Sequence, residues 1–158
     1  MLTGLNEFGR LRRVAMRRPQ DAMIDQATVD REWRDLNYHT APDFRRAVTE
    51  HQRFADIIAG VGAEILYLPA DDALTMDSLY VRDAAMVCPR GVILCNMGKP
   101  ARRGEPAIHG TTFEKAGVPV IGKITGSGSV EGGDLIWLDE KTVAIGRTYR
   151  TNDEGIRQ

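Results

Sequence analysis

The chain has 158 residues, of which 42% are hydrophobic and 27% are charged, as is typical of a globular protein with an ordinary core. A formal net charge of −1 gives no surplus of positive charge for binding nucleic acid or an anionic membrane surface. The sequence has neither a signal-peptide pattern nor an apolar run long enough to span a membrane, so it predicts a cytoplasmic protein.

The first predicted elements are a strand, a long loop and a helix. The strand covers residues 11–18 and stops at Pro19, and the polar residues 20–41 predict a loop anchored by Trp33 and Tyr38. A helix is expected from Pro42 to Gly60, because apolar residues recur there near the 3.6-residue spacing of one helix face. The residues on this face are Phe44, Val48, Ala55 and Ile58.

The rest of the chain alternates strands with helical patterns, which predicts an α/β fold. In order, we expect a strand at 63–69, a loop at 70–78, strands at 79–87 and 91–96 joined by a tight turn, a helix at 104–116, a strand at 118–124, a glycine-serine loop at 125–129, strands at 134–138 and 142–146, and a helix start at 151–155. Cys88 and Cys95 flank the predicted turn of the first strand pair. Buried free thiols are the favoured interpretation, and a disulfide across the hairpin is the alternative.

An internal repeat underlies this order. Residues 82–95 (RDAAMVCPRGVILC) align without a gap on residues 133–146 (GDLIWLDEKTVAIG), so that Asp83 falls on Asp134. Each unit would contain a strand, an acidic loop, a hairpin and a helix, which favours a structural repeat over chance similarity. Since the third unit stops inside its helix, we expect residues 1–158 to be an incomplete domain.

Acidic and arginine side chains form three clusters at matching places in these units. The clusters are Asp77, Arg82 and Asp83; Arg102 and Arg103; and Glu131, Asp134 and Arg150. Carboxylates on one side of a common space and guanidinium groups on another suit a zwitterionic, arginine-like ligand. Each cluster, taken singly, is also consistent with a turn, a surface ion pair or a solvated loop.

Other chemistries fit less well. The stretch GSGSVEGG approximates a dinucleotide fingerprint, but Glu131 stands at its third glycine position and a strand follows instead of a helix. The three histidines, His39, His51 and His109, are scattered and lack metal-ligand spacing. We therefore expect no metal site, and no nucleophile with an adjacent base is visible.

Five motifs, in this order, resemble the guanidino-group-modifying superfamily of dimethylargininases, arginine deiminases and amidinotransferases. They are EFGRLRRVAMRRP, MDSLYVRDAAMV, ARRGE, VEGGDLIWL and IGRTYRTNDEGIRQ. The resemblance extends from about residue 7 to the end of the chain. The pair Arg82-Asp83 is more similar to arginine deiminases and amidinotransferases, because dimethylargininases carry an acid before this aspartate.

The resemblance implies an αβ-propeller (pentein-like) fold, of which this chain would hold about three of five modules. It also implies catalysis by a cysteine thiolate and a histidine, without metal or organic cofactor. Asp83 and Glu131 would grip the substrate guanidinium, and Glu131 would orient the histidine. The predicted substrate-binding residues are Asp77, Arg82, Arg102, Arg150 and Asp134. Among them, Arg102 and Arg150 would hold the α-carboxylate of the substrate, and a structural role is the alternative for Asp134.

The family's catalytic histidine and cysteine positions have no counterpart in this sequence, since neither cysteine and none of the three histidines matches them. The sequence thus predicts the N-terminal portion of a hydrolase or amidinotransferase for a small guanidino substrate, inactive by itself. The alternative is a shortened, non-catalytic binding or assembly module, with a second copy of the chain as a candidate partner. Neither nucleic acid nor a membrane is an expected partner.

Overall fold

The structure, a computed structural model, describes residues 5–158 and divides into two compact units. One unit is Leu11–Val81. The other joins Arg82–Gln158 with the described residues up to Arg10.

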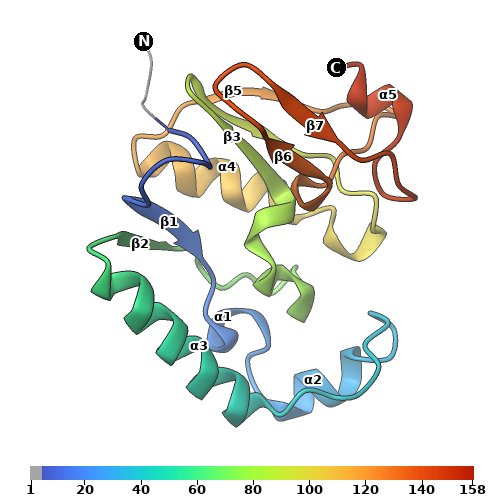
Figure 1. Cartoon of the computed structure of the whole chain (residues 1–158). Helices are drawn as coiled ribbons and strands as arrows, with labels where there is room; N and C mark the ends of the chain where they lie inside the picture. The colour runs from blue at the N-terminus through green and yellow to red at the C-terminus, as the bar shows by residue number, and fades with distance from the viewer. Residues whose placement is uncertain (1–4) are drawn as a thin grey trace. The chain divides into compact units, whose positions relative to one another are not determined.

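The unit Leu11–Val81 is built on a parallel strand pair connected through helices. Its elements are β1 (Arg13–Met16), α1 (Pro19–Ala22), α2 (Gln26–Glu32), α3 (Phe44–Gly60), β2 (Glu64–Tyr67) and a 3₁₀ turn at Met76–Leu79. In register, Arg13 pairs with Glu64 and Met16 with Tyr67. The strand–helix–strand crossover that parallel pairing requires is therefore formed within this unit (Figure 1).

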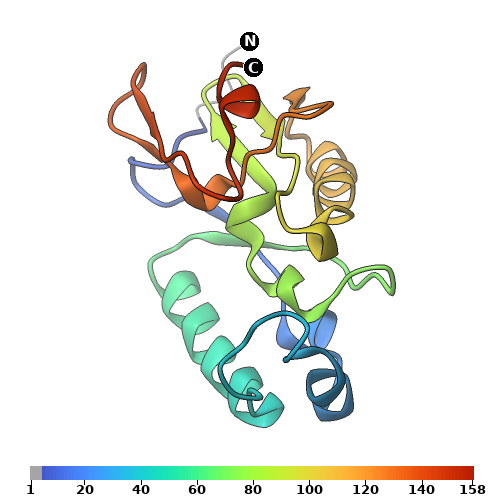
Figure 2. The ribbon, with the colours of Figure 1, turned by 90° about the vertical axis from the view of Figure 1, so that its right-hand side faces the viewer.

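Helix α3 confirms the predicted helix and its buried face. The Asp43 side chain caps it by accepting a hydrogen bond from the Arg46 amide at 2.8 Å. Ala55 is buried, whereas Phe54 and Ile57, which lie outside this face, are exposed. The α1 helix packs against α3 (Figure 1), and Figure 2 shows α3 along its length in a view turned by 90°.

The prediction of a long loop over residues 20–41 is wrong in part, because α2 and all but the first residue of α1 lie within it. Both helices are short, and contacts distant in sequence hold them. The Gln26 side chain accepts from the Phe44 amide at 2.8 Å, and Glu32 accepts from the Met76 amide at 2.9 Å. The predicted anchors are confirmed, because Trp33 and Tyr38 pack on a cluster of buried side chains. This cluster consists of Met23, Val29, Leu36 and Met76.

The second unit contains a three-stranded sheet and a separate hairpin. Its elements are a 3₁₀ turn at Val81–Ala84, β3 (Ala85–Cys88), β4 (Gly91–Leu94), a 3₁₀ turn at Pro100–Arg102, α4 (Glu105–Lys115), β5 (Val120–Lys123), a 3₁₀ turn at Gly132–Asp134, β6 (Leu135–Trp137), β7 (Val143–Ile145) and α5 (Asp153–Ile156). The predicted strand over 79–87 starts later than expected, since the 3₁₀ turn occupies its first part.

The sheet has the order β3-β4-β5, with β3–β4 antiparallel and β4–β5 parallel, and α4 makes the crossover against it (Figure 1). Gly91 is required in β4: its φ is +147°, and a Cβ there would overlap the Pro119 carbonyl oxygen. Cys88 and Cys95 are both buried and free, which confirms the favoured interpretation of the cysteines.

The two hairpins of the predicted repeat are both antiparallel, and each follows a 3₁₀ turn that carries its aspartate. Their registers differ by one residue, because Ala85 pairs with Leu94 whereas the aligned Ile136 pairs with Ala144. The turns explain the difference. The first is the short Pro89-Arg90 connection, while the second is closed by Asp139, which accepts from the Thr142 amide at 2.8 Å.

Candidate functional site

The Gly132-Gly133 pair brings two of the predicted clusters together. A Cβ at Gly132 would overlap the carbonyl oxygen of Arg82, and one at Gly133 would overlap the Asp83 carboxylate. At Gly132 the overlapping atom belongs to the backbone, so only glycine there permits this approach of the segment before β6 to the turn before β3. The segment therefore lies directly against Arg82 and Asp83.

Arg102 and two carboxylates form the first charged cluster. The Arg102 Nε and Nη2 atoms donate to the two oxygens of Glu105, each at 2.7 Å, and Nη1 donates to Asp83 Oδ2. Asp83 Oδ1 accepts from the Gly133 amide at 3.1 Å. The Arg102 and Glu105 side chains are 2% and 0% exposed, so this is a buried, bidentate ion pair.

The charge state of Arg102 follows from these contacts. Burial opposes its ionisation, but the hydrogen bonds and charges of Glu105 and Asp83 outweigh burial and raise the pKa of Arg102. The guanidinium thus stays charged and holds Asp83 in place.

Glu131 and Arg150 form the second charged cluster. Arg150 Nη1 donates to Glu131 Oε2 at 2.8 Å, and the other carboxylate oxygen accepts from the Lys99 amide at 3.1 Å. The Glu131 side chain is 3% exposed, whereas that of Arg150 is 30% exposed. The Arg150 Nε atom also donates to the Tyr149 hydroxyl at 3.0 Å. The hydrogen bond to Glu131 raises the pKa of Arg150.

Asp134 contacts hydroxyl groups rather than a cation. Its Oδ2 atom accepts from Thr148 Oγ1 at 2.8 Å and from Thr151 Oγ1 at 2.6 Å. Within the Glu-Gly-Gly-Asp segment, the Glu131 side chain thus contacts Arg150, the Gly133 amide contacts Asp83, and the Asp134 side chain contacts the two threonines.

Two predicted residues lie apart from these contacts. The Arg82 side chain turns to Glu7 and to the Leu135 carbonyl oxygen, to which Nη2 donates at 2.8 Å. Asp77 is buried in the other unit, in the turn Met76–Leu79. There, burial raises the pKa of Tyr38, and Tyr80 and the nearby Asp77 charge act in the same direction.

Cys95 lacks the features of a nucleophile. Burial raises the pKa of the Cys95 thiol to about 12, and the neighbouring Asp83 charge adds to the rise. Of the histidines, His109 is fully buried edge-on against Phe113, and burial lowers the pKa of His51. Within residues 5–158, no three His, Cys, Asp or Glu side chains are grouped to hold a metal ion.

Several partners of the site residues were not predicted from the sequence. Glu105 and the Lys99 amide were missed, and so were Thr148 and Thr151. Glu105 stands three residues after Arg102, a spacing at which oppositely charged side chains meet across a helical turn, so this partner had a detectable signal.

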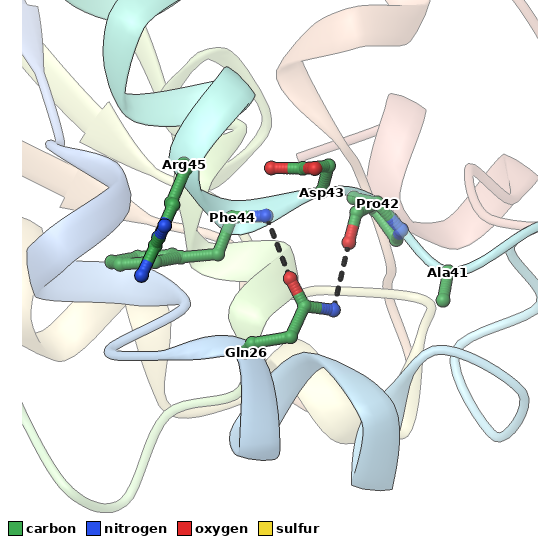
Figure 3. Close-up of a pocket in the computed structure, with 6 residues that line it drawn as sticks. All are labelled: Gln26, Ala41, Pro42, Asp43, Phe44 and Arg45. Carbon is green, nitrogen blue, oxygen red and sulfur yellow. Dashed lines mark hydrogen bonds between the residues drawn. The ribbon is translucent and has the colours of Figure 1, made fainter.

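An open pocket in the unit Leu11–Val81 is not part of this site. It is lined by Gln26, Ala41, Pro42, Asp43, Phe44 and Arg45. Figure 3 shows the Gln26 amide bridging the Phe44 amide and the Pro42 carbonyl. The Gln26 side chain therefore stabilises the start of α3. None of the predicted site residues lines the pocket. Across the described part of the chain, no helix is both long and apolar enough to cross a membrane.

The chain is similar in sequence to arginine deiminases and to a dimethylarginine dimethylaminohydrolase. The family model described as arginine deiminase matches residues 74–158. The chain is 31% identical over 117 residues to N(G),N(G)-dimethylarginine dimethylaminohydrolase of Pseudomonas aeruginosa, a match that covers 74% of this chain and 45% of that protein. It is 33% identical over 85 residues to arginine deiminase of Listeria monocytogenes, covering 50% of this chain and 21% of that one.

Solved structures of similar enzymes have the same fold. A cysteine-to-serine variant of the Pseudomonas aeruginosa dimethylarginine dimethylaminohydrolase, complexed with citrulline, superposes with a TM-score of 0.77 at 27% identity, covering 93% of this chain and 54% of that one. The N-terminal domain of a cyanobacterial arginine dihydrolase has a TM-score of 0.72 at 22% identity, covering 90% and 51%. The fold is thus the mixed α/β fold of these enzymes, and the chain spans less than half the length of the curated relatives named above.

Proposed function

The chain belongs to the arginine deiminase family, and from this premise we propose that residues 82–158 form the ligand-gripping part of a guanidino-group hydrolase. The ligand would be L-arginine or a close derivative. The relatives named above are hydrolases, which favours hydrolysis over the amidino transfer that the sequence left open.

The observation that carries this proposal is the pair between Glu131 and Arg150. The carboxylate of Glu131 is buried at 3% exposure, and it already accepts a hydrogen bond from a guanidinium group at 2.8 Å. A ligand guanidinium has the same shape and charge as that of Arg150. We expect it to take the place of Arg150 on Glu131, near Asp83, and to free Arg150 for the carboxylate of the ligand.

Arg150 is better suited to this exchange than Arg102. It is 30% exposed and pairs with one carboxylate, whereas Arg102 is 2% exposed and pairs with two. The prediction that Arg102 also holds the ligand carboxylate stays untested. Its hydrogen bonds favour a role in orienting Asp83 instead.

The implied reaction begins with addition of a cysteine thiolate to the guanidinium carbon. A carbon–nitrogen bond then breaks as the amine leaves with a proton from a histidine, and water releases citrulline and restores the thiolate. Cys95 does not fit this role, because a thiol with a pKa of about 12 is almost entirely protonated near neutral pH. We propose that residues 1–158 bind the substrate without turning it over.

The proposed architecture is an incomplete αβ-propeller whose modules are the successive strand groups and their helices. The similar hairpins β3–β4 and β6–β7, each preceded by a 3₁₀ turn with an aspartate, support a modular origin. The location in the cytoplasm and the contact of Asp77 with the substrate stay predictions.

An assembly role is the second candidate, and the outer face of β6–β7 favours it. Ile136 and the adjacent Leu138 are 60% and 62% exposed. A strand pair that is apolar on both faces is typical of a sheet covered on both sides. A second copy of the chain is one candidate to cover this face. Sedimentation across a concentration series would test it, and a monomer at all concentrations would contradict a homodimer.

Calorimetric titration tests the binding proposal. We expect the chain to bind L-arginine but not L-ornithine, which lacks the guanidinium, and to form no citrulline. Glu131→Gln should weaken L-arginine binding by about tenfold or more, because a charged hydrogen bond contributes about 1.5–3 kcal/mol. The matched control is Glu140→Gln, an exposed residue in the turn between β6 and β7. Equal binding of ornithine and arginine would contradict the proposal, as would citrulline formation by this chain. The same titration with dimethylarginine shows which of the two compounds the chain binds more tightly.

A further inference from the structure

Two threonine hydroxyls converge on one oxygen of Asp134. Thr148 Oγ1 lies 2.8 Å and Thr151 Oγ1 lies 2.6 Å from Asp134 Oδ2. Each hydroxyl also accepts hydrogen bonds from backbone amides. Thr151 Oγ1 accepts from the Glu131 amide at 3.1 Å, and Thr148 Oγ1 accepts from the amides of Arg150 at 3.0 Å and Thr151 at 3.1 Å.

The direction of these hydrogen bonds is fixed by chemistry. An ionised carboxylate can only accept, so both hydroxyls must give their single proton to Asp134. The oxygen lone pairs of the two hydroxyls then accept the hydrogen bonds from the backbone amides. In Thr148 the donor and both lone pairs are used, and in Thr151 the side chain is fully buried, so water cannot substitute.

We propose that Asp134, Thr148 and Thr151 form a chain of hydrogen bonds that positions Glu131 and Arg150 relative to each other. This chain of hydrogen bonds, which transfers no proton, is called the relay. One carboxylate oxygen orients two hydroxyls, and these hydroxyls hold the backbone at the two residues that form the charged pair. Asp134 is therefore a positioning residue, and it contacts neither end of the ligand.

The surrounding chain makes the position of Arg150 sensitive to the relay. Gly98 packs so closely that a Cβ there would overlap the Arg150 backbone, which blocks movement in that direction. The Lys99 amide, one residue later, donates to Glu131 at 3.1 Å. The Arg150 backbone thus contacts both Gly98 and the Thr148 hydroxyl, and loss of the hydroxyl removes one of these two contacts.

Amide hydrogen exchange measured by NMR tests the relay without any ligand. Thr151→Val keeps the side-chain shape and removes the hydroxyl, so protection of the Glu131 amide should fall by about tenfold or more, as expected for a lost hydrogen bond of about 1.4 kcal/mol. Thr148→Val should expose the Arg150 and Thr151 amides to a similar extent and leave the Glu131 amide protected. Asp134→Ala should expose all three.

Matched serine variants separate positioning from packing. Thr151→Ser and Thr148→Ser keep the hydroxyl and should retain the protection of the parent chain, while an amide of β4, such as Ile93, serves as reference. Thr148 is exposed, so its valine variant should fold even if Thr151→Val does not. The relay is overturned if Thr148→Val leaves the Arg150 amide as protected as before, or if Asp134→Ala leaves the Glu131 amide unchanged.

A ligand experiment connects the relay to the site, and it rests on the proposed function. Thr148→Val should reduce the preference for L-arginine over agmatine, which lacks the carboxylate, because Arg150 loses its position. Thr151→Val should weaken both ligands. If the parent chain binds neither ligand, the proposed function fails, while the exchange data still decide the relay. If Thr148→Val keeps the full preference for L-arginine, the relay has no part in ligand recognition and the inference is wrong for the site.

Discussion

The two arginine–carboxylate clusters of the unit Arg82–Gln158 contain the same chemical groups but differ in burial and saturation. Arg102 is 2% exposed, and each of its three guanidinium nitrogens donates to a carboxylate oxygen of Glu105 or Asp83. Arg150 is 30% exposed and donates to a single oxygen of Glu131 and to a tyrosine hydroxyl. A buried guanidinium whose three nitrogens all donate to carboxylates stabilises the fold. A partly exposed guanidinium with one carboxylate partner can exchange that partner for a ligand.

The largest expected effect is that of Arg102→Ala. It leaves two carboxylates, one fully buried, without their guanidinium, and breaking such a pair costs about 3–5 kcal/mol of unfolding free energy. Urea unfolding followed by Trp137 fluorescence in a Trp33→Phe background reports on this unit, because the chain has two tryptophans and only Trp137 lies in it. The exposed neighbour gives the control, Arg103→Ala, with a change of about 0.5 kcal/mol or less. Equal losses of unfolding free energy in Arg102→Ala and Arg103→Ala would contradict a structural role of the Arg102 ion pairs.

Gly132→Ala should have the next largest effect. Its Cβ would overlap the Arg82 carbonyl oxygen, a backbone atom that cannot turn aside, so we expect a loss of about 1–3 kcal/mol from overpacking. In the matched Gly146→Ala, the nearest atom lies 3.5 Å away, which is ordinary contact. The same urea assay compares the two. A Gly132→Ala chain as stable as Gly146→Ala would show that the close approach of the clusters is not required.

The smallest expected effect is that of Arg150→Ala. Because Arg150 is partly exposed and Glu131 keeps the Lys99 amide, we expect a stability loss of about 1 kcal/mol. Binding of L-arginine should nevertheless fall to the level of agmatine, as measured by calorimetry. A stability loss as large as that of Arg102→Ala would place Arg150 among the structural arginines.

The sequence predicted the elements whose patterns are local. The periodicity of α3 and the tight turn between β3 and β4 were sufficient, and the first hairpin is present although its first strand starts later than predicted. Helices α1 and α2 were missed because partners far along the chain hold them, as Glu32 holds the Met76 amide. No local pattern reports such contacts.

The candidate site was predicted in its residue types but not in its pairing. The charges of Asp83, Arg102, Glu131 and Arg150 were visible in the sequence. Which carboxylate meets which arginine depends on the close approach at Gly132 and Gly133, and no charge pattern encodes that. The relay was missed for a similar reason, since threonine hydroxyls gain their direction only from the position of Asp134.

The most direct test of the contrast between the two arginines is an NMR titration of the ¹⁵N-labelled chain with unlabelled L-arginine. The Nε–H signals of Arg102 and Arg150 report on each guanidinium separately. We predict that the Arg150 signal shifts and saturates with the bound fraction, because Arg150 leaves Glu131 for the ligand carboxylate, while the Arg102 signal stays in place. Saturable binding that moves the Arg102 signal and leaves the Arg150 signal unchanged would contradict the account.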